Sequence, residues 1–257
     1  MKKYLPFASV SVKELFRWRA NVILQTTMFH LPLLGYFFFF KLLYAGNFQF
    51  GNYNFKELFT YYFWALLAYS TMPSTGSYEL VEQIKSGVII HYLSKPINFV
   101  HSWIALTTGG TITWSLFFGL SAVPVIFFLK NYFILPKIEN LALGIVFLSL
   151  GYILSLLLGL SLSFTAFFVG DPFGVYDIYW MTIGLLGGAI IPVDLLPKGL
   201  QYLPFRYIYF TPAKVFTGAT HNILQELTIC VSYIIFFGFL VHLLWTKGLK
   251  RYEAFGG

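Results

Sequence analysis

Long apolar stretches separated by short polar connections dominate the chain. A helix needs roughly 20 apolar residues to cross the hydrocarbon core of a bilayer, because its backbone must satisfy its own hydrogen bonds there. Six stretches reach or approach this length, and the second and fifth are the shortest. The pattern therefore predicts an all-α, polytopic membrane protein with six transmembrane helices, over residues 20–44, 58–74, 99–129, 141–169, 175–191 and 223–245.

The beginning of the chain carries a different pattern. Leu5, Ala8, Val12 and Leu15 recur at helical spacing, and polar or charged residues lie elsewhere on the wheel, at Ser9, Lys13, Glu14 and Arg17. This spacing predicts an amphipathic helix over 1–19 that lies in the membrane interface. The alternative is a frayed basic tail. The charged residues also interrupt the apolar core that a signal peptide needs, so the segment is expected to stay in the mature protein.

Composition supports a membrane protein and excludes an ordinary soluble globule. Of the 257 residues, 58% are apolar and 11% are charged, whereas soluble domains average about 45–50% and 25%. The net charge of +7 would suggest nucleic acid as a partner of a soluble chain. In a membrane protein, basic residues instead gather on cytoplasmic loops, so no nucleic-acid partner is expected. The single cysteine, Cys230, lies in an apolar stretch and is expected to pack as a small hydrophobic side chain.

The basic residues also predict which way the chain faces. An even number of spans puts both termini on one side of the membrane. If that side is the cytoplasm, the excess of basic residues lies inside, and Lys41 lies near the outer end of the first span. This excess predicts cytoplasmic termini. The inner residues are Lys2, Lys3, Lys13, Arg17, Arg19, Lys85, Lys95, Lys247, Lys250 and Arg251, and the outer ones are Lys56, Lys130, Lys137, Lys198, Arg206 and Lys214.

Small residues form a stripe along the fourth predicted span and recur in the fifth. Every fourth position of the stripe is glycine or serine, which lets another helix approach closely in lipid. We interpret these residues as helix-packing positions, and a substrate path is the alternative. They are Gly151, Ser155, Gly159 and Ser163 in the fourth span, and Gly184 and Gly188 in the fifth.

What the spans lack narrows the classes of transporter. Secondary transporters and proton pumps usually carry ionisable residues near the middle of the membrane. No predicted span has an acidic residue in its middle. His30 lies well inside the first span, where a hydrogen-bonded packing role is favoured over a proton relay. An ion-coupled secondary transporter is therefore the weaker alternative.

Catalytic motifs are also missing from the sequence. The chain has no G-x-x-x-x-G-K-[ST] loop for phosphates, no H-E-x-x-H zinc motif and no G-x-S-x-G nucleophile turn. We therefore expect no ATP hydrolysis by this chain and no bound metal. A membrane-embedded, lipid-modifying enzyme stays open as an alternative, because polar residues lie on the predicted cytoplasmic side at His91, His101, Asp171 and Asp177.

The predicted cytoplasmic loop over 75–98 contains a short charged helix. Glu79, Glu82 and Lys85 recur at i, i+3 and i+6, so they share one edge of that helix, and Gly87 is placed to end it in a left-handed cap. A short charged helix beneath a membrane bundle is suited to dock into a cleft of a soluble partner. The alternative is a solvated loop with one charged face.

The predicted outer segment over 192–222 is divided by prolines. The four residues Pro192, Pro197, Pro204 and Pro212 cut a mostly apolar stretch into pieces too short to cross the bilayer. Such pieces predict re-entrant helices that dip into the outer leaflet and return, which requires protein or water to satisfy the broken backbone.

Taken in order, these features resemble a known family. The loop carries the pattern I-x-x-G-x-x-x-x-x-L-x-x-P at Ile84, Gly87, Leu93 and Pro96, and the outer segment carries P-x-x-x-x-P followed by P-F-x-Y and a further proline. With six spans and an N-terminal interfacial helix, the chain resembles permease subunits of ABC-2 type ATP-binding-cassette exporters. It is most similar to a bacterial branch of comparable length whose permeases are often encoded as unlike pairs.

The resemblance implies a role for each of the two loops. The chain would be a single transmembrane domain over 1–257 without catalytic activity, and two short segments would carry its function. The ATPase-coupling residues would be Glu79, Glu82, Lys85, Gly87 and Pro96. The outer re-entrant gate would include Pro192, Pro197, Pro204, Phe205 and Pro212.

The resemblance also implies partners and a location. Separate ABC ATPase subunits would bind ATP and Mg²⁺, and a second permease would complete the pathway. That permease is either identical or different in sequence, and the unlike pairs of the bacterial branch favour a different chain. This chain would bind no cofactor of its own. We expect it in the bacterial inner membrane, in contact with lipids, exporting an amphiphilic cargo such as a lipid, drug or peptide.

Overall fold

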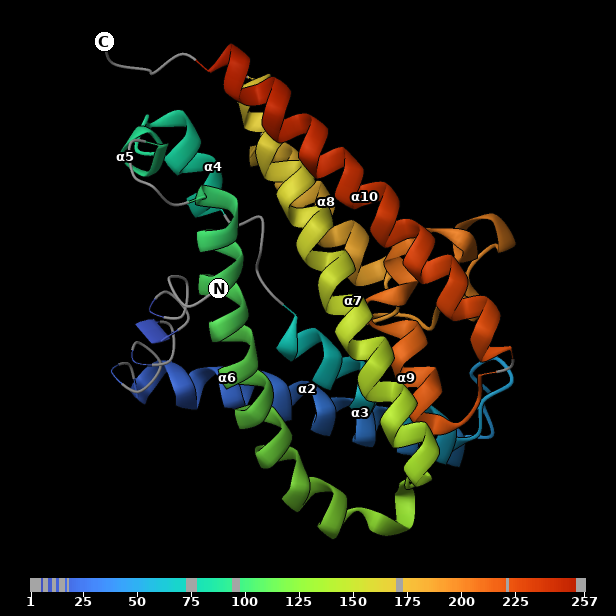
Figure 1. Cartoon of the computed structure of the whole chain (residues 1–257). Coiled ribbons are helices and arrows are strands. Elements are labelled where there is room, and N and C mark those ends of the chain that lie inside the picture. The colour runs from blue at the N-terminus through green and yellow to red at the C-terminus, as the bar shows by residue number, and fades with distance from the viewer. Residues whose placement is uncertain are drawn as a thin grey trace.

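The computed structural model is helical almost throughout. It describes residues 6, 9–10, 13, 17, 19–72, 78–93, 98–169, 173–220 and 222–252. These residues form no β-strand, and one isolated bridge joins Phe50 and Tyr53, so the predicted all-helical class is confirmed for this part of the chain. The α-helices are α2 (Arg19–Ala45), α3 (Phe55–Thr71), α4 (Tyr78–Lys85), α5 (Ile90–Leu93), α6 (Phe99–Phe128), α7 (Ile138–Phe164), α8 (Phe173–Leu186), α9 (Phe210–Thr217) and α10 (Ile223–Arg251) (Figure 1).

Short 3₁₀ helices join several of these elements. They are η2 (Lys130–Tyr132), η3 (Thr165–Phe167), η4 (Val193–Leu195), η5 (Lys198–Tyr202) and η6 (Pro204–Tyr207). The predicted interfacial helix over 1–19 falls mostly outside the described residues.

Four helices are long and apolar enough to cross a membrane. They are Val22–Ala45 within α2, the whole of α6, Ile138–Phe167 from α7 into η3, and α10. The second and fifth predicted spans correspond to α3 with 17 residues and α8 with 14, which fall short of the roughly 20 residues of a typical crossing. Length and composition therefore support four of the six predicted spans.

A capping box sets the first residue of α3. The side chain of Asn54 accepts a hydrogen bond from the backbone N–H of Glu57 at 2.9 Å, and the Glu57 carboxylate accepts one from the Asn54 N–H at 2.9 Å. Two N–H groups that the first helical turn cannot satisfy are thereby paired.

Removing this cap tests its contribution to stability. We expect Asn54→Ala to lower the free energy of unfolding by about 1 kcal/mol, because one helix N–H loses its partner. Asn52→Ala, two residues away at an exposed position, is the matched control and should leave the free energy unchanged. Denaturant unfolding followed by circular dichroism measures both, and equal losses would contradict the assignment.

A glycine ends α8 before the predicted limit at residue 191. Gly188 has a φ of +93°, a conformation that glycine adopts without the cost of a side chain. The N–H groups of Ala189 and Ile190 both donate to the carbonyl of Gly184, at 3.1 and 3.2 Å. The chain therefore leaves the helix at this point.

The centre of the bundle is α3. Every side chain from Leu58 to Leu66 is buried, and α3 packs against α2, α6 and α9. Its apolar side chains share one core with residues of these neighbours, including Phe29, Phe118 and Phe216. A helix that is buried on all sides needs no lipid around it, so α3 can be shorter than its neighbours.

The helix α7 packs more extensively against its neighbours than any other described helix does. It lies beside α10 (Figure 1) and packs against α9 near its first residues and against α4 near its last. A helix of 27 residues is about 40 Å long. The bundle therefore has two ends, which we name the α9 end and the α4 end.

Large apolar side chains cover the outside of the long helices. Exposed leucine, isoleucine, methionine and phenylalanine recur on α2, α6 and α10, among them Leu42, Leu120, Phe128, Leu224 and Phe239. A soluble monomer rarely exposes so much contiguous apolar surface, whereas a bilayer covers it without cost. The structure is therefore that of a membrane protein.

Candidate functional site

An apolar face holds α4 onto the end of the bundle. Leu80, Val81 and Ile84 are at most 1% exposed and share a core with residues at the ends of α7 and α10 and in η3. The Tyr252 hydroxyl also donates to the carbonyl of Ile84 at 3.1 Å. Burial of three aliphatic side chains stabilises this position by roughly 1.5–3 kcal/mol for each side chain, so α4 is anchored to the end of the bundle.

The opposite edge of α4 is charged and open. Glu79 and Glu82 are exposed, and Lys85 is half-buried, which is the edge that their spacing predicted. Gly87 has a φ of +83° and turns the chain towards α5. Pro96 lies outside the described residues. The segment 78–93, which we call the α4 segment, therefore exposes two carboxylates, of which Glu79 also borders a cavity of the bundle, while its other face is anchored.

A large cavity opens between α2, α3, α6 and α8. Its volume is about 710 Å³, and we call it the central cavity. Three tryptophans line it together with several hydroxyl and amide side chains, and Glu79 lies on its wall. These residues include Trp103, Trp114 and Trp180, with Gln25, Ser70, Thr107 and Thr111.

The central cavity was not predicted from the sequence, although α6 carries a signal for it. Trp103, Thr107, Thr111, Trp114 and Phe118 recur three or four residues apart and therefore share one face of α6. Each is commonplace in a membrane helix, and only the packing of four helices shows that this face borders a space.

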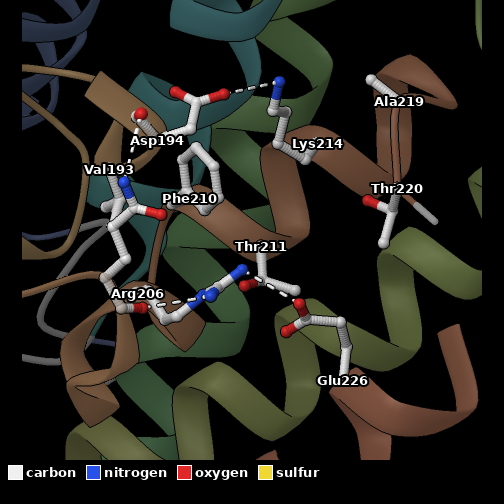
Figure 2. Close-up of a pocket in the computed structure, with 10 residues that line it drawn as sticks. Val193, Asp194, Arg206, Phe210, Thr211, Lys214, Ala219, Thr220 and Glu226 are labelled. Atoms are coloured by element: carbon white, nitrogen blue, oxygen red, sulfur yellow. Dashed lines mark hydrogen bonds and ion pairs between the residues drawn. The ribbon is translucent and has the colours of Figure 1, made fainter. Parts of the chain in front are cut away.

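Charged residues meet in a second cavity, at the α9 end. It has a volume of about 410 Å³, and we call it the α9 pocket. Arg206 Nη2 lies 3.0 Å from Glu226 Oε1, and Lys214 Nζ lies 3.0 Å from Asp194 Oδ2 (Figure 2). Its other lining residues are Val193, Gln201, Phe210, Thr211, Ala219 and Thr220.

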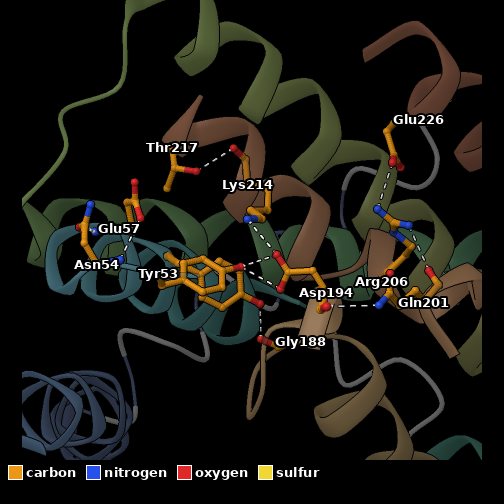
Figure 3. Close-up of polar contacts among 11 residues, drawn as sticks. Tyr53, Asn54, Glu57, Gly188, Asp194, Gln201, Arg206, Lys214, Thr217 and Glu226 are labelled. Carbon is orange, nitrogen blue, oxygen red and sulfur yellow. Dashed lines mark hydrogen bonds and ion pairs between the residues drawn. The ribbon is translucent and has the colours of Figure 1, made fainter. Parts of the chain in front are cut away.

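Tyrosines tie this region to α3 and to the loop before it. The Tyr53 hydroxyl donates to both carboxylate oxygens of Asp194, at 2.8 and 2.6 Å, and the Tyr61 hydroxyl donates to the Gly188 carbonyl at 2.5 Å (Figure 3). Burial, followed by the bond to Asp194, raises the pKa of Tyr53 well above its usual value. The Tyr53 hydroxyl therefore stays protonated at physiological pH and acts as a hydrogen-bond donor to Asp194.

The prolines of 192–222 lie where short helices begin. Pro192 and Pro197 immediately precede η4 and η5, and Pro204 is the first residue of η6. Proline suits a first helical position because its fixed φ matches the helix and its missing N–H would have no partner there. Pro212 is buried in α9, and Phe205, which follows Pro204 in η6, is half-buried.

The small residues lie in the interior of the bundle. Gly151 faces the backbone of η6, where an added Cβ would come within 2.5 Å of the Tyr207 carbonyl oxygen. Ser155 and Gly159 are buried, and the Ser163 hydroxyl lies 2.5 Å from that of Tyr176. The remaining two residues of the predicted set, Gly184 and Gly188, lie in and just beyond α8.

Neither ion pair of the α9 pocket was predicted. The predicted spans leave Arg206 and Lys214 in the outer segment and Glu226 at the outer end of the last span, where isolated charges are ordinary. Three basic residues, Lys198, Arg206 and Lys214, and two acidic residues, Asp194 and Glu226, fall within the mostly apolar segment 194–226. Nothing in the sequence shows which of them pair, and only the packed structure joins Arg206 to Glu226 and Lys214 to Asp194.

Comparison with known proteins gives one result. The family model described as ABC-2 family transporter protein matches residues 30–256, a range that includes most of α2 and all of α3 to α10. No curated protein and no solved structure matches the chain.

Proposed function

Because the chain belongs to the ABC-2 family of transporter proteins, we propose that it is the permease subunit of an ATP-binding-cassette exporter. Membership of this family implies a transport role and ATPase partners. Within that assignment, this chain is a non-catalytic membrane subunit, and ATP and Mg²⁺ bind to the separate ATPase subunits.

The observation that carries the proposal is the construction of α4. A docking helix must hold a partner on one side and transmit its movement on the other. Glu79 and Glu82 are exposed, with Glu79 on the wall of the central cavity, whereas Leu80 and Ile84 are buried against the ends of α7 and α10. Movement of an ATPase bound at the charged edge would therefore be transmitted directly to two long helices.

The chain order supports a topology of six crossings in one domain, 1–257. Successive connections alternate between the α4 end and the α9 end, with α3 as a short crossing inside the bundle and α8 as a short crossing whose Ile178 and Met181 side chains are exposed. We place the α4 end and both termini in the cytoplasm of a bacterial cell, on the positive-inside excess. The segment 1–19 lies in the inner interface, and 192–222 forms the re-entrant gate on the outer side.

Export follows from coupled movement of two permeases. Two ATPases close on ATP, each carries the α4 segment of its permease with it, and the pathway between the permeases changes its opening. The second permease is a different chain, in line with the unlike pairs of the bacterial branch. Glu79, Glu82 and Lys85 contact the ATPase, and Gly87 and Pro96 shape the return to α6.

The central cavity supports an amphiphilic cargo. Its three tryptophans offer apolar faces, and Gln25, Thr107 and Thr111 offer hydrogen bonds. Pockets that bind small molecules are typically apolar with a few polar groups that orient the ligand. A lipid, drug or peptide with both kinds of surface fits this lining better than a simple ion does.

Charge reversal on α4 tests the proposal. We expect Glu79→Lys/Glu82→Lys to reduce the ATPase recovered with the affinity-tagged permease by about tenfold, because attraction at an interface becomes repulsion. Co-purification from membranes, followed by ATPase assay of the eluted complex, measures the loss.

A matched control separates docking from a general charge effect. Glu139→Lys makes the same change at an exposed helical position at the α9 end and should leave recovery of the ATPase intact. Because Glu139→Lys reverses one charge, its ATPase recovery is compared with that of the single variant Glu82→Lys. Normal ATPase association and normal transport in the double variant would overturn the docking role of α4.

A further inference from the structure

The α9 pocket concentrates polar atoms that have no partner. Among the described residues, seven buried side-chain atoms lack a hydrogen bond, and four of them line this one cavity. Thr211 is the clearest case, because it is only 1% exposed and its hydroxyl has no partner among the described residues. The four atoms are Arg206 Nε, Thr211 Oγ1, Thr220 Oγ1 and Glu226 Oε2.

Such atoms are costly unless something occupies the pocket. A buried polar group without a partner is less stable than one that is hydrogen-bonded, and native proteins contain few of them. Four around one space of about 410 Å³ indicate a site that a polar occupant completes. Figure 2 shows Arg206, Thr211 and Glu226 close together, with Thr220 on the far side of the pocket.

The charges of the pocket favour a neutral occupant. Its two basic side chains, Arg206 and Lys214, are each 3.0 Å from an acidic partner, Glu226 and Asp194, so the site carries no net charge. An ion entering it would lose its hydration without meeting an uncompensated opposite charge.

The unpartnered atoms require an occupant that both donates and accepts hydrogen bonds. Arg206 Nε can only donate, Glu226 Oε2 can only accept while ionised, and the two threonine hydroxyls can do either. A ligand hydroxyl group supplies both functions in one atom. Several hydroxyls on a rigid frame would therefore satisfy all four atoms without any charge.

The rest of the lining adds carbon surface. Val193, Phe210 and Ala219 border the same space, and a sugar ring presents C–H faces between its hydroxyls. We propose that the α9 pocket binds a neutral polyhydroxylated group of the size of a sugar ring. The sugar is either free in solution or the headgroup of a glycolipid. This site does not depend on the proposed function, since binding is measured without an ATPase.

Ligand binding to the purified full chain tests the inference. The protein is prepared without sugar-containing detergents and placed in phosphatidylcholine nanodiscs. Methyl β-glucoside is then titrated while thermal unfolding is followed, and a parallel preparation contains glucosyl diacylglycerol in the nanodisc. We expect a saturable rise in the unfolding midpoint, because a ligand that binds only the folded state stabilises it.

Two threonine variants locate the response in the α9 pocket. Thr220→Ala and Thr211→Ala should each weaken the apparent affinity by about tenfold, which is the loss expected for one well-made hydrogen bond. Thr211→Ser keeps the hydroxyl and should restore binding even if Thr211→Ala folds poorly. Thr217→Ala, on the same helix but outside the lining of this pocket, should bind as the unchanged chain does.

The outcomes distinguish a soluble sugar from a glycolipid headgroup, and sugar binding from a pocket that holds water or phosphate. A response to the free glucoside assigns a soluble sugar, and a response only to the glycolipid assigns a lipid headgroup. Both support the inference when Thr220→Ala weakens them. The inference is overturned if neither probe binds, which leaves a pocket filled by water alone, if the variants respond equally, or if inorganic phosphate binds as well as the sugar.

Discussion

Gly151→Ala is expected to destabilise the protein by about 1–3 kcal/mol or more, although it adds one methyl group. The new Cβ would lie 2.5 Å from the carbonyl oxygen of Tyr207 and 3.3 Å from the Cα of Ile208. Both are backbone atoms, so no side chain can turn aside to make room. Either α7 or η6 would have to shift, and η6 borders the α9 pocket through Arg206.

A second glycine provides the matched control for this change. Gly119 lies inside α6, and an added Cβ there would meet no atom within 4 Å. Because alanine favours the helix over glycine by roughly 0.8–1 kcal/mol, Gly119→Ala should leave the protein equally stable or slightly more stable. Thermal unfolding of both purified variants measures the difference. An equal shift of the two midpoints would refute the role of Gly151 as a close-contact position.

Arg206→Met is expected to cost about 3 kcal/mol, because it leaves the Glu226 carboxylate in a mostly buried site without its cation. The two side chains are only 18% and 19% exposed, and Arg206 Nη1 also donates to the carbonyl of Gln201 at 3.0 Å. One substitution therefore removes an ion pair and a contact that orders the segment before η6. Unfolding by denaturant in detergent micelles gives the free energy.

The other ion pair of the pocket supplies the comparison. Lys214→Met should cost about 1 kcal/mol, because Asp194 is 37% exposed and keeps two hydrogen bonds from Tyr53. Adding Glu226→Gln to Arg206→Met should recover part of the loss, since the unpaired charge is then gone. A larger loss for Lys214→Met than for Arg206→Met, or no recovery in the double variant, would show that charge burial is not the cause.

Local patterns were enough to predict the long helices. The span predicted at 99–129 is found as Phe99–Phe128, and the one predicted at 223–245 begins at Ile223 and continues to Arg251. Each is a long apolar run, and in the first case Asn98 caps the start, accepting from the N–H of His101 at 3.1 Å. Helix formation depends mainly on neighbouring residues, so sequence spacing predicts it well.

The charged edge of α4 was also predictable, because Glu79 and Glu82 are close in sequence and helical spacing alone puts them on one side. The end of α8 was not. Its predicted limit at residue 191 ignores the turn at Gly188, which is packed between Tyr61 and Phe210 from two other helices. The Gly187-Gly188 pair is a local turn signal, but glycine is also frequent inside membrane helices. The distant residues packed around Gly188 decide that the helix ends there.

The sequence by itself determined that the chain is helical, apolar and built for a membrane, and that a short charged helix precedes Gly87. The tertiary structure alone decided that α3 is buried on all sides, that four helices enclose the central cavity, and that Asp194, Arg206, Lys214 and Glu226 surround one pocket. The physical reason is the separation along the chain over which each interaction acts. Helix periodicity acts over a few neighbouring residues, whereas a cavity or an ion pair forms only when separate helices have packed and brought distant positions together.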